Sequence, residues 1–315
     1  MSNSVLKVDS SVMKKLETHY SQYKVDKLPP GSIFVAKLPS CTITAYKSGK
    51  VLFQGGAAQV EASKWGASES TNPAASGVKS TAKPKAQHGY APPKDIAELS
   101  IIGSDEVGTG DYFGPMTVVA SYVSKDKIPL LKELGVKDSK NLNDTQICEI
   151  AKDIIEVIPY SLLILHNPKY NQLQSSGMTQ GKIKALLHNQ AINHLFDKIA
   201  PTQPDGILID QFAEPGVYFR HLQDQKRVIK ENVYFSTKAE GVHLSVAASS
   251  IIARYAFVKQ FEKLSNKAGM TLPKGAGAQV DVAAAKLIKK LGVEALGEFT
   301  KLHFANTEKA KKLMK

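Results

Sequence analysis

Two adjacent carboxylates, Asp105 and Glu106, follow a short apolar run and precede three closely spaced glycines within LSIIGSDEVGTGDYFGP (99–115). This pattern predicts a buried strand, an acid pair and then a tight loop. Neighbouring carboxylates at the exit of a hydrophobic strand repel each other in a partly dry site, so they require a cation or a shifted pKa. A divalent metal ion satisfies that requirement.

Two further acids follow apolar runs: Asp210 ends GILID (206–210), and Glu240 comes just after ENVYFSTK (231–238). In an open α/β sheet the carboxyl ends of adjacent parallel strands meet at one crevice, so these side chains are expected to converge with Asp105 and Glu106. A pair of Mg²⁺ or Mn²⁺ ions about 3.5–4 Å apart would neutralise four carboxylates and support phosphodiester hydrolysis. Taken singly, each acid would more often be a solvated turn residue or a helix cap.

The elements that position these acids alternate between strand and helix patterns. Beyond the strand leading into Asp105, apolar β-rich runs predict strands at 115–124, 157–166, 206–210 and 231–240. Helical periodicity predicts helices at 128–136, 143–156, 179–199 and 243–264. The fold class is therefore α/β: a mixed five-stranded sheet, three strands in an antiparallel meander and later strands added parallel through flanking helices.

The N-terminal part predicts a separate small α+β unit. A helix from 9 to 22 and a helix at 57–65 flank strands at 32–38, 42–48 and 50–56. One sheet face carries Tyr46 and Lys50, and Lys47 lies on the same sheet; these residues could stack on and bind nucleic acid, although an ordinary half-buried sheet explains them equally well. The predicted organisation is a domain at 1–65, a flexible linker rich in Ala, Ser, Lys and Pro at 66–95, and a second domain at 96–315.

Composition narrows the function classes. The 315 residues carry a formal net charge of +12, of which residues 1–95 contribute 13 Lys and 6 acids, and this balance favours a polyanionic partner such as nucleic acid. No apolar run is long enough for a membrane span, and the N-terminus lacks a secretory pattern. Cys41 and Cys148 lie far apart without zinc spacing, so we expect a cytoplasmic protein.

Four motifs in this order, DEVGTGDYFGP, VKDSK, ILID and KAEGVHLSVAASSIIAR, resemble the type 2 ribonucleases H, most closely the ribonuclease HIII branch of that family. The likeness covers residues 96–315, while residues 1–65 resemble the TATA-binding-protein-like substrate domain of that branch. The resemblance implies a ribonuclease H-like fold and a monomeric endonuclease that cuts the RNA strand of RNA/DNA hybrids, using Mg²⁺ or Mn²⁺ and leaving 5′-phosphate and 3′-hydroxyl ends.

The same resemblance implies which residues act. The catalytic and metal-binding set consists of Asp105, Glu106, Asp210 and Glu240, with Glu214 as an outside candidate. The implied contacts to the nucleic-acid backbone are Gly108, Thr109, Gly110, Lys137, Ser139 and Lys140. We interpret His188, His243, Ser249 and Ser250 as packing residues.

Thr109 stands where ribonuclease HII has an arginine in a Gly-Arg-Gly turn, so we predict better cleavage of several consecutive ribonucleotides than of a single one. Two alternatives remain: a ribonuclease HII-like enzyme that incises at single ribonucleotides in DNA, and a non-catalytic nucleic-acid-binding protein.

Overall fold

The computed structural model describes residues 3–26, 28–29, 31–65 and 89–314, which fall into two compact units. Unit 1 holds the described residues up to Gly89 together with 126–136 and 152–158, and unit 2 holds the remainder. Most of the predicted linker, 66–88, lies outside the described residues. Residues 126–136 and 152–158 group with the N-terminal sheet, whereas the sequence pattern assigns them to the second domain.

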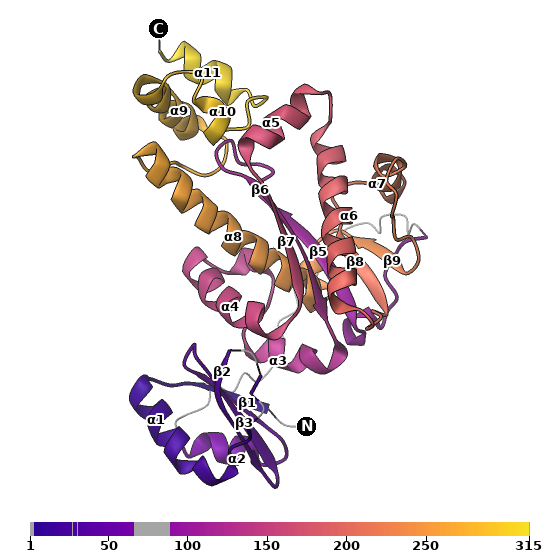
Figure 1. Ribbon diagram of the computed structural model, residues 1–315, viewed down its shortest axis with the longest axis vertical. Helices are drawn as coiled ribbons and strands as arrows, with labels where there is room; N and C mark the ends of the chain where they lie inside the picture. The colour runs from indigo at the N-terminus through magenta and orange to yellow at the C-terminus, as the bar shows by residue number, and fades with distance from the viewer. Residues whose placement is uncertain (1–2, 27, 30, 66–88, 315) are drawn as a thin grey trace, which may run out of the picture. The chain divides into compact units, whose positions relative to one another are not determined.

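Unit 1 contains a four-stranded antiparallel sheet in the order β1-β4-β3-β2 (Figure 1). Its strands are β1 (Asn3–Lys7), β2 (Ser32–Leu38), β3 (Cys41–Tyr46) and β4 (Lys50–Gln54), and its helices include α1 (Ser10–His19) and α2 (Ala58–Ser63). Asp9 caps α1, because its carboxylate accepts from the N–H groups of Ser11 and Val12 at 2.8 and 2.9 Å. Leu16, Phe34 and Phe53 lie in the shared core.

Unit 2 is built on a five-stranded sheet in the order β7-β6-β5-β8-β9. The strands are β5 (Ile101–Val107), β6 (Met116–Val123), β7 (Tyr160–Leu165), β8 (Gly206–Asp210) and β9 (Val233–Ser236). β5, β6 and β7 form an antiparallel meander, whereas β8 joins β5 and β9 joins β8 in parallel. The predicted fold class and strand directions are therefore confirmed.

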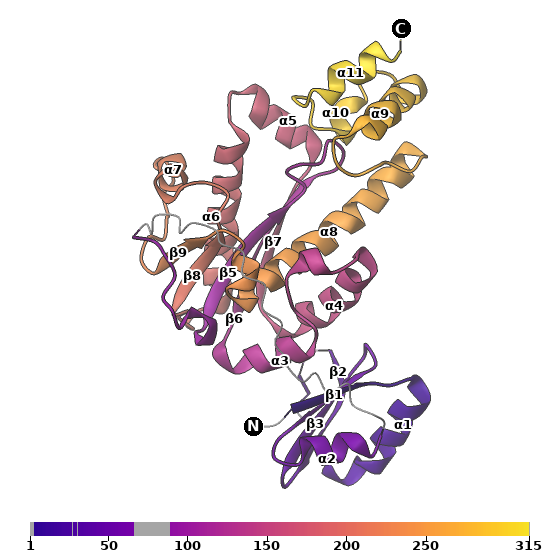
Figure 2. The same cartoon turned by 180° about the vertical axis from the view of Figure 1, so that it is seen from behind.

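Two long helices, α6 (Gln180–Ile199) and α8 (Leu244–Ala268), cover opposite faces of this sheet (Figures 1 and 2). α8 approaches β5 closely because Gly103 has no side chain, and a Cβ there would lie 2.3 Å from the backbone of Ser245. The Ser249 hydroxyl donates to the Gly103 carbonyl at 2.9 Å. Small residues on α8 thus serve the close packing that the sequence indicates.

The remaining helices of the chain connect the strands or follow α8. They are α3 (Ile128–Glu133), α4 (Asp144–Val157), α5 (Asn167–Ser175), α7 (Pro215–His221), α9 (Ala278–Leu291), α10 (Leu296–Phe299) and α11 (Asn306–Lys312). The three C-terminal helices enclose an aromatic core that includes Tyr112 and Phe113 of the loop after β5 and Phe257 of α8. None of the helices in the described ranges combines the length and the apolar character that crossing a membrane requires.

Candidate active site

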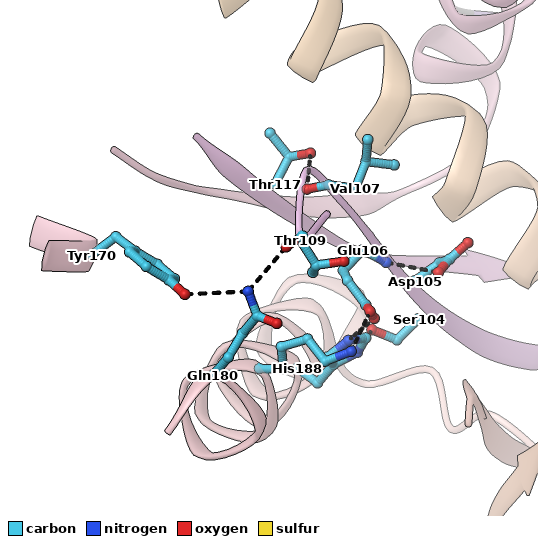
Figure 3. Close-up of polar contacts among 10 residues, drawn as sticks. Ser104, Asp105, Glu106, Val107, Thr109, Thr117, Tyr170, Gln180 and His188 are labelled. Atoms are coloured by element: carbon cyan, nitrogen blue, oxygen red, sulfur yellow. Dashed lines mark hydrogen bonds and ion pairs between the residues drawn. The ribbon is translucent and has the colours of Figure 1, made fainter. Parts of the chain in front are cut away.

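Strand β5 presents its two acids to opposite faces of the sheet. Successive side chains of a strand alternate, so Asp105 faces α8, where it accepts a hydrogen bond from Ser250, and Glu106 faces α6. Figure 3 shows the Glu106 side chain reaching toward His188 while Asp105 points away from it. The Glu106 N–H donates to Asp105 Oδ1 at 2.7 Å. The two carboxylates therefore have different surroundings despite being neighbours in sequence.

Asp105 lies in an environment that disfavours its charge. Its side chain is buried, and the pKa of its carboxyl lies well above the ordinary value because of burial first and then the negative charges of Glu106 and Asp210. Glu240 contributes in the same direction, and the Ser250 hydrogen bond opposes it. Strand-end acids from separate elements are thus close enough to interact electrostatically, as the sequence predicts.

Glu106 is held by two cationic or polar partners on α6. Its Oε1 lies 2.7 Å from Lys184 Nζ and its Oε2 lies 2.9 Å from His188 Nε2. Burial alone would raise the pKa of Glu106, but the hydrogen bonds and charges of His188 and Lys184 outweigh it and lower that pKa. His188 is in turn fixed by Ser104 Oγ at 2.7 Å from its Nδ1 and by stacking on Phe212.

His188 is therefore a packed residue, as the sequence indicates, but one that contacts an acid of the site. Sequence reasoning missed Lys184, although its spacing of four residues from His188 places both on one face of α6.

Asp210 and Glu240 come from the ends of β8 and of the turn after β9. Asp210 Oδ1 accepts from the Ala239 N–H at 2.8 Å, and burial with the nearby acids raises the pKa of Asp210. Glu240 is buried, and its Oε2 accepts from the Ser139 N–H at 2.7 Å. Lys238 adopts a left-handed conformation (φ 59°) that turns the chain so that Ala239 and Glu240 face Asp210 and Ser139.

The donor set fits hard divalent cations. All four acids offer carboxylate oxygens, which Mg²⁺ and Mn²⁺ prefer, and the pKa of Asp105 is raised by burial and then by negative charge that a cation would offset. Among the described residues, no three His, Cys, Asp or Glu side chains are gathered closely enough to hold a metal ion by themselves, and each of the four acids bonds a protein donor. Open oxygen sites completed by water and substrate phosphates are typical of Mg²⁺.

The Gly-Thr-Gly loop, Gly108 to Gly110, directly follows β5. Gly108 has φ +95°, and a Cβ there would lie 2.2 Å from the Pro115 carbonyl, so glycine is required at this position. Thr109 is half-buried and Gly110 is exposed. The loop thus presents backbone beside the acidic strand end.

The loop at 137–140, predicted to contact nucleic acid, contains two exposed lysines and one buried serine. Lys137 is exposed, and Lys140 Nζ lies 3.3 Å from Glu240 Oε1 with 70% of its side chain exposed. Ser139 is buried and bonds both Glu240, through its N–H, and Ser250, through its hydroxyl at 2.9 Å. Arg254 of α8 holds this loop by donating to the Ser139 carbonyl at 2.8 Å. The two lysines remain available to an anion, whereas Ser139 supports an acid.

The candidate contacts in unit 1 are mostly engaged within the protein. Tyr46 is 5% exposed, and burial followed by the Asp153 charge raises its pKa to about 12. Lys50 Nζ lies 2.9 Å from Asp153 Oδ2 and donates to the Leu134 carbonyl at 3.1 Å. Lys47 is exposed. Alternation along the strand predicts the face of each residue, but not that Leu134, just after α3, and Asp153 of α4 contact it.

Two other residues weighed from sequence have structural positions. Glu214 is exposed and precedes α7, where its carbonyl accepts from Val217 and Tyr218 at 2.8 and 3.0 Å. His243 is buried and caps α8, since its Nδ1 accepts from the Ser245 N–H at 3.0 Å. Its Nε2 lies 3.2 Å from the Leu99 carbonyl.

Comparison with known proteins places this geometry in a family. Residues 102–307 match the family described as ribonuclease HII, and residues 3–77 match a domain of unknown function, DUF3378. The chain is 63% identical over 317 residues to a ribonuclease HIII of Bacillus mycoides (strain KBAB4), with all of both chains covered. It is 62% identical over 316 residues to a ribonuclease HIII of Bacillus thuringiensis subsp. konkukian (strain 97-27), again with full coverage.

Solved structures agree in fold. A Q54A mutant of Bst-RNase HIII is 49% identical with a TM-score of 0.70, covering 100% of this chain and 99% of that one. Bst-RNase HIII in complex with Mn²⁺ is 48% identical with a TM-score of 0.69 and the same coverage. Identity at this level across both units shows common descent of the whole chain, and the chain therefore belongs to the ribonuclease HIII family.

Proposed function

We propose that this protein hydrolyses the RNA strand of RNA/DNA hybrids as a divalent-metal-dependent endonuclease, leaving 5′-phosphate and 3′-hydroxyl ends. Membership of the ribonuclease HIII family and the Mn²⁺ complex of a Bst relative support this activity. The observation that carries it to particular residues is the electrostatic coupling of Asp105 to Glu106, Asp210 and Glu240.

The four acids have distinct duties. Asp105, Asp210 and Glu240 would hold Mg²⁺ or Mn²⁺, and Glu106 would join them from the α6 side of β5. The bound ions supply activation of the attacking water and stabilisation of the leaving oxygen. Lys184 and His188 fix the orientation and charge of Glu106, and Ser139 fixes Glu240.

Substrate contacts follow from the groups exposed beside these acids. The Gly-Thr-Gly loop offers backbone N–H groups to a phosphate, and Lys137 and Lys140 offer ammonium groups to the backbone. Thr109 lacks the charge and length of the arginine found in ribonuclease HII, which supports a preference for consecutive ribonucleotides. Contacts to 2′-hydroxyls and duplex shape would distinguish the hybrid from DNA duplexes.

The basic N-terminal unit would add substrate affinity, with Lys47 as an exposed contact. Tyr46 and Lys50 are bonded or buried within unit 1, so they would support that face from within it. We further propose that the protein acts in the cytoplasm as a monomer, in keeping with its free cysteines, Cys41 and Cys148.

The test is cleavage of a labelled RNA/DNA hybrid by the full-length protein, with Mg²⁺, with Mn²⁺ and with neither. Asp105→Asn keeps the shape of the side chain but removes the charge, so we expect a loss of at least about 100-fold in kcat with hybrid binding retained. Asp197→Asn, at an exposed ion pair with Arg227, is the matched control and is expected to cleave normally. Cleavage by Asp105→Asn within tenfold of the wild-type rate would remove Asp105 from the site.

The same assay with three further substrates separates the alternatives. We expect slow cleavage of a DNA duplex carrying one ribonucleotide and no cleavage of RNA/RNA or DNA/DNA. Equal rates on the single ribonucleotide and on the hybrid would indicate ribonuclease HII-like specificity. Binding without any cleavage, in either metal, would indicate a non-catalytic protein.

A further inference from the structure

Lys301 is a lysine with no exposed surface, and it lies outside the acidic set. Its Nζ donates to the Asp111 carbonyl at 2.8 Å and to the Gly114 carbonyl at 2.6 Å. Both acceptors belong to the loop that runs from Gly108 to Gly114, between β5 and β6. A cation from the C-terminal part of the chain therefore holds two carbonyl groups of the loop that follows Asp105 and Glu106.

Gln180, the first residue of α6, holds the same loop at a third carbonyl. Its Nε2 donates to the Thr109 carbonyl at 3.0 Å and contacts the Tyr170 hydroxyl at 3.2 Å. Figure 3 shows this amide between the Thr109 backbone and the Tyr170 ring. Lys301 Nζ lies 5.8 Å from the centre of the same ring. Tyr170 therefore lies close to both donors.

Further bonds fix the backbone of this loop. The Tyr112 N–H donates to the Gly275 carbonyl at 2.9 Å, and the Gly275 N–H donates to Asp111 Oδ1 at 2.6 Å. By contrast, within the described part of the chain the N–H groups of Thr109 and Gly110 donate to no acceptor. The carbonyls are thus held by the protein, while two consecutive N–H groups beside the acidic site are free to bind an anion.

Burying a lysine ammonium group costs free energy that an apolar side chain would avoid. Burial lowers the pKa of Lys301 to about 8, with the Asp111 charge opposing the shift. An apolar side chain of similar length would avoid this penalty but would leave the Asp111 and Gly114 carbonyls without a donor. The two carbonyl bonds, rather than packing, therefore account for a lysine here.

We propose that Gln180 and Lys301 are positioning residues that hold the loop from Gly108 to Gly114 in the conformation whose N–H groups bind the phosphate backbone of the hybrid. Neither residue contacts an acid of the site in the described structure. They act on substrate affinity rather than on the hydrolytic step. This inference rests on the proposed function of the loop.

The decisive variant is Gln180→Met in the full-length protein, because Gln180 is only half-buried and methionine keeps its length without the amide donor. Loss of one such hydrogen bond predicts a rise in KM of about fivefold on the RNA/DNA hybrid with kcat within about twofold of wild type. Gln172→Met, at an exposed glutamine of α5, is the matched control and should leave both constants unchanged. Lys301→Met is expected to raise KM further, since it removes two bonds to the loop.

Backbone hydrogen exchange in the absence of substrate provides an independent readout. Gln180→Met and Lys301→Met should accelerate exchange of the hydrogen-bonded amides of Tyr112 and Gly114, whereas Gln172→Met should not. Unchanged KM with unchanged exchange in Gln180→Met would overturn the proposal, and so would an equal fall in kcat and kcat/KM at constant KM. A wild-type protein that cuts no hybrid would instead refute the proposed function, while the exchange result would still decide whether these residues hold the loop.

Discussion

The pH dependence of stability provides a quantitative test of the packing between α8 and β5. His243 is 3% exposed, and its ring accepts the Ser245 N–H that begins α8. Burial lowers the pKa of His243 from 6.5 to about 4, against the opposing bond to the Leu99 carbonyl. The folded protein therefore keeps this imidazole neutral at pH values where the unfolded chain protonates it.

The sign and size follow by proton linkage. Below pH 6.5 the unfolded chain binds a proton at His243, whereas the folded protein does not bind it until about pH 4. Protonation therefore favours the unfolded chain, and the unfolding free energy falls as the pH falls from 6.5 to about 4. The full difference corresponds to about 3.4 kcal/mol of unfolding free energy. Between pH 7 and pH 5 the expected loss is about 1.8 kcal/mol.

Urea unfolding of the wild type and of His243→Asn at pH 7 and pH 5 measures this loss. Asparagine can cap α8 but does not titrate. Between pH 7 and pH 5 the unfolding free energy of the His243→Asn protein should therefore fall by about 1.8 kcal/mol less than that of the wild type. The carboxyl groups titrate in both proteins and cancel in this difference. His194→Asn, at an exposed histidine of α6, should keep the wild-type pH dependence. If His243→Asn also keeps the wild-type pH dependence of the unfolding free energy, His243 is not held neutral in the folded protein.

Two further predictions concern the sheet packing and the N-terminal unit. Gly103→Ala should lower the unfolding free energy by about 1–3 kcal/mol in urea titrations, because its Cβ would meet the Ser245 backbone, whereas Gly216→Ala, with no atom near its Cβ, should not. Lys47→Ala should weaken hybrid binding and reduce the slope of log affinity against log salt by about 1 if this ammonium contacts a phosphate. Lys289→Ala, at an exposed lysine of α9, controls for net charge; an equal effect would assign no specific contact to Lys47.

Much of the catalytic unit could be predicted from the sequence because short-range patterns determine it. Apolar runs bounded by glycines and other turn residues predict all five strands of the sheet, and the order of strands and helices predicts the strand directions. Acids at strand ends were expected to meet because parallel strands end at one edge of a sheet. The coupling of Asp105 to Asp210 and Glu240 agrees with that expectation.

The parts that escaped prediction depend on contacts distant in sequence. In the sequence, Lys184 looks like an ordinary lysine of a helix. Its contact with Glu106 arises only because α6 packs beside β5. Lys301 lies in a charged and aromatic segment whose pattern does not indicate burial, and only the C-terminal packing encloses it. Likewise, Tyr46 and Lys50 occupy the predicted sheet face, but the sequence cannot say that Asp153 and Leu134 contact it.

The pleat of β5 explains why two adjacent acids differ in pKa. Glu106 turns to α6, where it accepts hydrogen bonds from His188 and Lys184 and lies beside the Lys184 charge, so its pKa is lowered despite burial. Asp105 turns to α8, whose contribution is a hydroxyl, and the charges that shift its pKa are those of other carboxylates. The electrostatic gain from an external cation is therefore largest on the Asp105 side of the strand, since the protein already neutralises Glu106. Two neighbouring residues of one strand thus differ: the protein offsets the charge of Glu106, whereas Asp105 is buried among other carboxylates.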